Sequence, residues 1–163
     1  CQILYFDRSP LLVKEGQYFS AVSTTLDSLL ESSDFILVCL PLNTATHHLI
    51  DVARIGQTKP GSYLVNISRG SVVDEKAVAD ALEDGHLAGY AADVFEFEDL
   101  ALVDRAREID ARLLTPDAPT VFTPHIGSAV TSVRKEIELE AARNIVQFLR
   151  GEIPEGVILK PVT

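Results

Sequence analysis

The chain has 163 residues, of which 47% are hydrophobic and 23% charged, and its formal net charge at pH 7 is −10. This length allows one domain, and the balance of apolar and charged residues is that of an ordinary soluble globular fold. The negative charge argues against a nucleic-acid-binding surface, and no apolar run approaches the ~20 residues that cross a bilayer.

The cysteines and the absence of methionine bear on the compartment and on the start of the chain. Cys1 and Cys39 are too few and too far apart for a disulfide scaffold or a metal cluster. We therefore expect free thiols in a reducing cytoplasm, and no secretory signal is visible. Because the chain has no methionine and opens on an apolar run, we expect an internal start, that is, a fragment of a longer protein.

Short apolar runs alternate with helical patterns along the chain, which is typical of βαβ units and a parallel sheet. Five runs are predicted to be buried strands: Ile3–Phe6, Phe35–Leu40, Tyr63–Ile67, Leu87–Phe95 and Thr120–Phe122. Such continuous apolar runs are expected where helices cover both faces of the sheet. The predicted fold class is therefore α/β, a Rossmann-type doubly wound parallel sheet.

Two short helices are predicted between these strands. The first spans Leu26–Ser32, and either of the two preceding threonines can cap it. The second spans Glu75–Glu83 after the capping residue Asp74, and Gly85 follows its end as a C-terminal glycine often does.

A long helix is predicted at about Ser128–Leu149, ended by Gly151. Its apolar side is formed by Val130, Val133, Ile137, Ala141, Ile145 and Phe148. Before it, the segment Phe97–Pro119 is predicted to be a surface excursion with a helical turn around Ala101–Ile109.

Candidate functional residues follow the predicted strands. In an open parallel sheet, ligands bind at the carboxyl ends of the strands. The residues found there are Asp7, Pro41, Ser68-Arg69-Gly70, Glu98 and His125, in chain order. Five strand ends that point to one edge indicate a single binding site.

Asp7 stands where a Rossmann fold places an acid that hydrogen-bonds the adenine ribose hydroxyls. Its carboxylate repels a 2′-phosphate, so the sequence favours NAD over NADP, although the neighbouring Arg8 weakens that preference. The glycine-rich turn is expected ~20 residues earlier, before residue 1. The alternative is an aspartate in an ordinary strand-to-loop turn.

Arg69 lies in the sharpest local motif, which reads NISRGS over residues 66–71. Gly70 is expected to let the backbone approach a ligand closely. The guanidinium can hold an oxyanion with two parallel hydrogen bonds. The alternative is a surface arginine in a turn.

His125 follows a short strand and precedes a helix, and its side chain suits proton transfer near neutral pH. Glu98 is available from the neighbouring strand end to fix its tautomer. The other histidines, His47, His48 and His86, have no acidic partner suggested by the sequence and are interpreted as packed or capping residues. No histidine pair has zinc spacing, so no metal is expected.

Three motifs in order carry a resemblance to a known family. They read VNISRGSVVDE over residues 65–75, GYAADVF over 89–95 and TPHIG over 123–127. Together they resemble the D-isomer-specific 2-hydroxyacid dehydrogenase superfamily, which implies an NAD-dependent oxidoreductase, cytoplasmic and homodimeric when full length. On this resemblance, residues 1–127 are the larger C-terminal part of the NAD-binding domain, 128–150 a helix leading back to a substrate domain, and 151–163 a tail.

Further stretches are similar to phosphonate (phosphite) dehydrogenases within that superfamily. They cover residues 32–43, 89–99, 108–110 and 125–138, and the segment after Glu98 discriminates best, since other members have a shorter, proline-rich stretch there. This implies oxidation of phosphite to phosphate, with hydride transfer to NAD. Two alternatives stay open: a dehydrogenase of a small D-2-hydroxy acid, and an NAD-sensing corepressor-like binding protein.

The resemblance also implies roles for individual residues. It makes Arg69 the binder of a small anionic substrate, His125 the acid/base, Glu98 its acidic partner and Arg134 a further active-site arginine; Glu96 has the same strand parity, so only the resemblance chooses Glu98. The residues it assigns to NAD are Asp7, Cys39, Leu40, Pro41, Ile67, Ser68, Arg69, Asp93, His125, Gly127 and Ser128. Since the substrate domain and the glycine turn are missing, this fragment alone is expected to be inactive, with no nucleic-acid or membrane partner.

Overall fold

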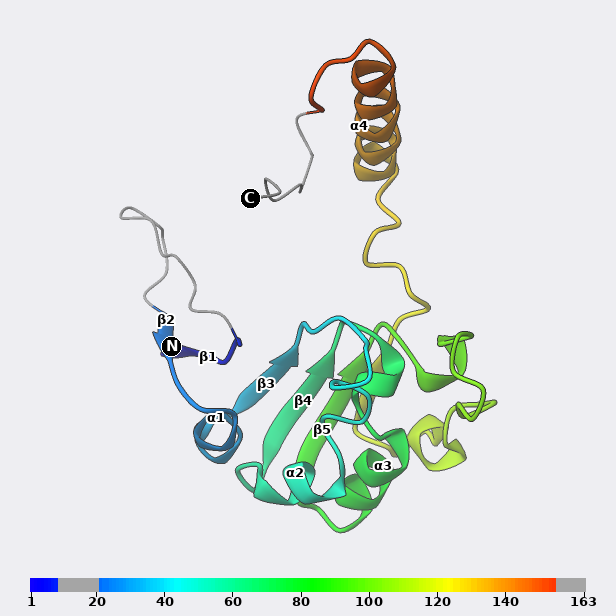
Figure 1. Ribbon diagram of the computed structural model, residues 1–163. Coiled ribbons are helices and arrows are strands. Elements are labelled where there is room, and N and C mark those ends of the chain that lie inside the picture. The colour runs from blue at the N-terminus through cyan, green and yellow to red at the C-terminus, as the bar shows by residue number, and fades with distance from the viewer. Residues whose placement is uncertain (9–20, 155–163) are drawn as a thin grey trace. The chain divides into compact units, whose positions relative to one another are not determined.

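The computed structural model describes residues 1–8 and 21–154 in two compact units, Cys1–Pro124 and His125–Thr163. The first unit contains, in order, β1 (Ile3–Tyr5), β2 (Ala21–Ser23), α1 (Leu26–Ser32), β3 (Phe35–Val38), α2 (Val52–Gln57), β4 (Ser62–Asn66), the 3-10 helix η1 (Gly70–Val72), α3 (Glu75–Glu83), β5 (Leu87–Ala92), the 3-10 helices η2 (Glu96–Glu98) and η3 (Ala111–Leu114), and β6 (Thr120–Phe122) (Figure 1). The second contains α4 (Thr131–Leu149). The predicted tail lies outside the described residues from position 155 onward.

A four-stranded parallel sheet in the order β3-β4-β5-β6 forms the centre of the first unit, and β1 and β2 form a separate parallel pair. The last residues of the four strands are register partners: Val38 pairs with Asn66, Asn66 with Ala92, and Ala92 with Phe122. This confirms the predicted Rossmann-like α/β fold with a parallel sheet. It also places the segments that follow the four strands along one edge.

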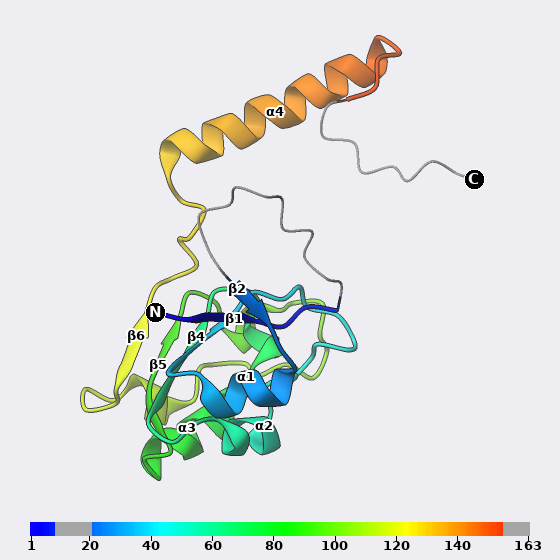
Figure 2. The same cartoon turned by 90° about the vertical axis from the view of Figure 1, so that its left-hand side faces the viewer.

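Helices α1, α2 and α3 pack on one another and on the same face of the sheet, as Figure 2 shows. The hydrophobic core between these helices and the sheet contains the buried residues Leu30, Ile36, Ile55, Leu64, Val78 and Leu87. On the opposite face Phe35 and Tyr63 stack with ring centroids 5.0 Å apart and remain exposed, as does Val121. The expectation that helices cover both faces is therefore not met by the described residues of this unit, although the strands are apolar on both sides.

Both short predicted helices are confirmed, with their caps. The Thr25 side chain accepts a hydrogen bond from the Ser28 amide at the start of α1, and Asp74 accepts one from the Ala77 amide at the start of α3. Gly85 ends α3 with φ +77°. The strand β2 and the helix α2 were not predicted, because three and six residues are too few to show a clear periodicity.

Arg112 attaches the segment between η2 and β6 to helix α3. Its guanidinium lies 2.6 Å from Asp80 and 2.8 Å from Glu83 on α3, and 2.7 Å from Asp110. The single-turn helices lie at 96–98 and 111–114, so the prediction of a helical turn around 101–109 is wrong. The turn forms where the Asp110 side chain caps the Arg112 amide, a contact that composition did not reveal.

In the second unit, α4 begins three residues later than predicted and ends as predicted. Gly151 adopts φ +74° and donates its N–H to the Phe148 carbonyl, which closes the helix end. No residue of α4 is buried. Across the described part of the chain, we find no helix with both the length and the apolar character to span a membrane.

Leu64 on β4 has no exposed surface, whereas 76% of Leu100 is exposed. Leu64→Ala is expected to lower the free energy of unfolding by about 2–5 kcal/mol, because it leaves a cavity in the core. Leu100→Ala should change it by less than about 0.5 kcal/mol. Urea unfolding of the whole protein measures both, and equal effects of the two substitutions would contradict the described core.

Candidate active site

The arginine loop, which we define as residues 67–71, is shaped by the buried side chain of Asn66. Its Oδ1 accepts hydrogen bonds from the Ser68 amide at 3.1 Å and the Ser68 hydroxyl at 2.9 Å. Its Nδ2 donates to the Arg69 carbonyl at 3.0 Å. The exposed Arg69 guanidinium donates to the Ser68 carbonyl at 2.6 Å. Asn66, at the end of β4, thus sets the backbone that presents Arg69 to solvent.

The acid turn, residues 95–99, packs directly against this loop. A Cβ added to Gly70 would lie 1.9 Å from the Phe95 carbonyl carbon and 2.2 Å from the Glu96 nitrogen. The Ser71 amide also donates to Asp99 Oδ2 at 2.7 Å. Gly70 was expected to admit a ligand. In the structure the close approach it allows is that of the acid turn, because the parallel register aligns the ends of β4 and β5.

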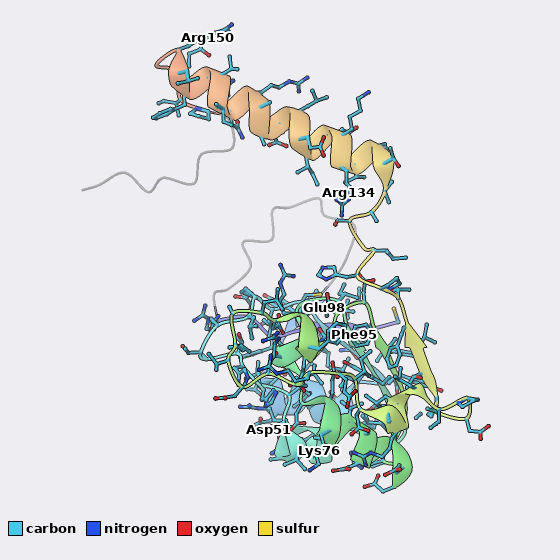
Figure 3. All side chains as sticks on the ribbon, turned by 90° about the vertical axis from the view of Figure 1, so that its right-hand side faces the viewer. Asp51, Lys76, Phe95, Glu98, Arg134 and Arg150 are labelled. Carbon is cyan, nitrogen blue, oxygen red and sulfur yellow. The ribbon has the colours of Figure 1, made fainter. Side chains whose placement is uncertain are left out.

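Glu98 closes the single turn of η2. Its Oε1 accepts a hydrogen bond from the Phe95 amide at 2.9 Å, and the side chain is half-buried. Figure 3 labels Phe95 and Glu98 together at this edge of the first unit. The arginine loop and the acid turn are therefore in contact, as their positions at neighbouring strand ends predicted.

Two buried glutamates lie next to this contact. Glu75 was not nominated as a functional residue, and Glu96 was considered only as the alternative to Glu98. Glu75 is 3% exposed and Glu96 is 7% exposed. Burial, and to a lesser extent the nearby Glu96, Glu98 and Asp110 carboxylates, raises the pKa of Glu75 to about 7, while a backbone hydrogen bond from Glu96 opposes the rise. A signal was present in the sequence, since Glu75 lies at helical spacing from Val78 on the apolar side of α3.

The interpretation of His48 as a histidine without an acidic partner is wrong. Its Nε2 lies 3.0 Å from Glu96 Oε2, and its backbone N–H donates to the Ser71 carbonyl. It also has φ +45°, an uncommon value for a side-chain-bearing residue. Sequence reasoning missed the pair because 48 residues separate its members. His47 stacks on His48, and His86 contacts the Thr58 hydroxyl, as packed histidines do.

The residues proposed to line the cofactor in the first unit lie at or after the strand ends. Cys39, Pro41 and Ile67 are exposed, Leu40 is half-buried and Ser68 is buried. Asp93, after β5, accepts a short hydrogen bond from the Thr123 hydroxyl. Asp7 is exposed after β1, in the separate two-stranded sheet. An exposed, partly apolar edge next to an arginine fits a flat cofactor with anionic groups.

The remaining candidates belong to the second unit. His125 has φ +54° and is followed by Gly127 and Ser128 in the segment before α4. Arg134 Nε donates to the Ser128 carbonyl at 3.2 Å, which ties the first turn of α4 to that segment. Figure 3 labels Arg134 at this end of the helix. These roles, like those of Arg69 and Glu98, stay predictions.

Within the described ranges 1–8 and 21–154, no group of three or more His, Cys, Asp or Glu side chains could hold a metal ion. The two cysteines are free and exposed. The described edge presents the exposed residue Arg69 on a loop that packs against the acid turn. A guanidinium can bind an anion, and a carboxylate can orient a proton-transfer group.

Comparison with known proteins gives a family match over most of the chain. Residues 1–127 match the family described as "D-isomer specific 2-hydroxyacid dehydrogenase, NAD binding domain". The glyoxylate reductase of Thermofilum pendens is 38% identical over 161 residues, which cover 99% of this chain and 45% of that protein. Glyoxylate/hydroxypyruvate reductase B of Pectobacterium carotovorum is 41% identical over 143 residues, covering 87% and 42%.

Solved structures share the fold as well. The D-lactate dehydrogenase of Aquifex aeolicus, crystallised with NAD and lactic acid, superposes with a TM-score of 0.75 at 31% identity, covering 93% of this chain and 47% of that one. The chain spans less than half the length of the curated relatives it matches. The two curated relatives are named as reductases of glyoxylate or of glyoxylate and hydroxypyruvate. They support the wider family and the 2-hydroxy acid alternative better than the expected likeness to phosphite dehydrogenases.

Gly70 and Gly56 offer a matched test of the loop contact. Gly70→Ala is expected to lower the free energy of unfolding by about 3 kcal/mol, because its Cβ meets the backbone of the acid turn. Gly56→Ala, in α2 with nothing within 4 Å, should instead raise it by roughly 0.5–1 kcal/mol through helix propensity. Thermal and urea unfolding measure both. A neutral Gly70→Ala would contradict the packing.

Glu75 makes stability depend on pH in a defined window. Its pKa is 4.5 in an ordinary setting and about 7 here, so the folded state binds the extra proton between these values. The free energy of unfolding should therefore fall as pH rises from 4.5 to about 7, by roughly 3 kcal/mol from this group. Glu75→Gln should remove that part of the slope. Urea unfolding at pH 5, 6, 7 and 8 tests this, and identical slopes for both proteins would refute it.

Proposed function

Because this chain belongs to the D-isomer-specific 2-hydroxyacid dehydrogenase family, whose NAD-binding domain it matches over residues 1–127, we propose that the protein carrying it interconverts a small 2-oxo acid and its D-2-hydroxy acid with NAD(H). Glyoxylate is the first substrate to test, since two relatives are named as reductases of it. The observation that carries the proposal is the contact between the arginine loop and the acid turn at the carboxyl edge of the sheet.

The residues of this chain have distinct tasks in the proposed reaction. Arg69 binds the substrate carboxylate, because a guanidinium donates two parallel hydrogen bonds to such a planar anion. His125 gives a proton to the carbonyl oxygen during reduction and takes it back during oxidation. The family resemblance implies that Glu98 is the acidic partner that fixes the tautomer of His125, and that Arg134 is a further arginine for the anion. NAD(H), when bound, supplies or accepts the hydride.

The site can bind NAD through its own residues. Ile67, Ser68 and the residues after β3 present an edge where a Rossmann-type sheet takes its cofactor. Asp7, which follows β1, is the proposed acceptor for the ribose hydroxyls. A homodimer and NAD in preference to NADP remain parts of the proposal.

Phosphite oxidation is the second candidate, favoured by the resemblance of the segment after Glu98 to that of phosphite dehydrogenases. In this segment, Asp99 accepts a hydrogen bond from the Ser71 amide, and Arg112 forms an ion pair with Asp80 of α3. Arg69 would bind phosphite as it binds a carboxylate, since both are anions with several acceptor oxygens. The corepressor-like alternative predicts NAD binding without turnover.

The whole protein is expected to oxidise NADH with glyoxylate or hydroxypyruvate and to give little NADH from phosphite. Steady-state assays at 340 nm measure both directions. Arg69→Lys should raise the KM for glyoxylate at least ~10-fold, because the paired hydrogen bonds are lost, and His125→Ala should lower kcat roughly 100-fold or more.

Arg107→Lys is the matched control, since Arg107 is exposed and its guanidinium donates to the Val103 carbonyl. It should leave both constants unchanged. Turnover of phosphite but of no 2-oxo acid would replace the proposal by the second candidate. NAD-dependent assembly without any turnover would favour the corepressor-like alternative.

A further inference from the structure

The backbone amides of Glu75 in α3 and Glu96 in the acid turn each donate a hydrogen bond to the other residue's carboxylate. The Glu75 amide donates to Glu96 Oε1 at 2.9 Å, and the Glu96 amide donates to Glu75 Oε1 at 2.8 Å. Glu75 opens α3 directly behind the arginine loop, and Glu96 is the second residue of the acid turn. Each carboxylate therefore binds the backbone of the other segment, and both are buried.

A third segment joins this pair from the turn before α2. His48 contacts the other oxygen of Glu96 and binds the Ser71 carbonyl of the arginine loop through its own amide. The neighbouring Ile50 forms a bridge with Val73. His48, with its uncommon backbone conformation, therefore contacts both the arginine loop and the acid turn. The Glu96 carboxylate contacts both His48 and the start of α3, so it links these segments.

The two carboxylates of the pair differ in their surroundings. Glu96 Oε2 has the His48 ring nitrogen at 3.0 Å, whereas Glu75 Oε2 is buried with no hydrogen-bond partner among the described residues. The groups that face Glu75 are Glu96 and Glu98 of the acid turn, Asp110 before η3, and Tyr90 of β5. Burial, and to a lesser extent repulsion by the Glu96, Glu98 and Asp110 carboxylates, raises the pKa of Glu75 to about 7, so Glu75 is protonated at lower pH.

We propose that Glu75 and Glu96 are a buried positioning pair that fixes the arginine loop against the acid turn, and that the substrate affinity of Arg69 depends on this pair. Neither glutamate touches the substrate in this proposal. Loss of the proton from Glu75 places a negative charge in a buried site where one carboxylate oxygen has no hydrogen-bond partner among the described residues, which loosens the loop and weakens substrate binding. The proposal rests on the proposed function for its kinetic consequence, but the loop ordering itself does not.

Substrate affinity provides the kinetic test in the whole protein. Glu75→Ala, which removes one hydrogen bond of the exchange, should raise the KM for glyoxylate at least 10-fold at pH 6.5, with kcat and the KM for NADH within 3-fold. Glu75→Gln keeps an oxygen acceptor for the Glu96 amide and should rescue KM to within 3-fold. Glu83→Ala, at an exposed glutamate of the same helix, removes only a surface ion pair with Arg112 and should leave kcat and both KM values unchanged.

The pH profile separates positioning from a merely structural role. Between pH 6 and pH 8.5 the KM for glyoxylate should rise in the parent protein by a factor at least 3 times larger than in Glu75→Gln, because glutamine cannot ionise. All other residues are the same in both proteins, so the difference between the two profiles reports on Glu75. Parallel profiles in the two proteins, or equal KM values for Glu75→Ala and the parent, would overturn the proposal.

Hydrogen exchange of the substrate-free protein tests the loop ordering independently of turnover. Peptides that contain residues 67–75 and 94–99 should exchange at least 10-fold faster in Glu75→Ala than in the parent and in Glu83→Ala. If the parent turns over no 2-oxo acid, the proposed function fails and this measurement still decides the pair. If Glu75→Ala does not fold, Glu75→Gln provides the test instead, through its dependence of KM on pH and its hydrogen exchange at pH 8.5. The same peptides should then exchange more slowly in Glu75→Gln than in the parent. Unchanged exchange would refute the pair.

Discussion

The alignment of four strand ends in one row is the constraint on which the rest of this structure depends. Val38, Asn66, Ala92 and Phe122 are register partners at the carboxyl ends of β3 to β6. Because parallel strands run in the same direction, every following segment leaves the sheet at the same edge. The arginine loop and the acid turn therefore meet, and only a glycine at position 70 permits the distance at which they pack.

The carboxylates near the proposed site have hydrogen-bond or ion-pair partners close by, in a chain whose net charge is −10. An anionic substrate needs a cationic group and few nearby anions, yet the proposed site lies next to several carboxylates. Glu96 accepts a hydrogen bond from the Glu75 amide and lies next to His48, and Glu98 accepts one from the Phe95 amide. Asp110, next to η3, forms an ion pair with Arg112. Glu75 is neutral below about pH 7. The exposed guanidinium of Arg69 is thus available for an external anion.

Much of the fold and part of the site could be predicted from the sequence. The helix boundaries of α1 and α3 were correct because capping residues and apolar spacing are local signals. Arg69 and Glu98 were nominated from strand-end position and resemblance, and their segments do lie together. The contact of His48 with Glu96 could not be predicted, since the two residues are 48 positions apart and nothing between them marks the pairing. The location of the turn at 111–114 likewise depends on the charges that Arg112 meets.

The sequence by itself determined the alternation of strands and helices, the parallel sheet, the family and the residue types able to bind an anion and transfer a proton. These follow from periodicity, caps and motifs within short windows of the chain. Only the tertiary structure decided that Gly70 serves the packing of two loops, that Glu96 is buried against Glu75 and His48, and that one sheet face of the first unit is exposed. Such facts depend on contacts between residues far apart in sequence and on the water excluded there, which local patterns do not encode.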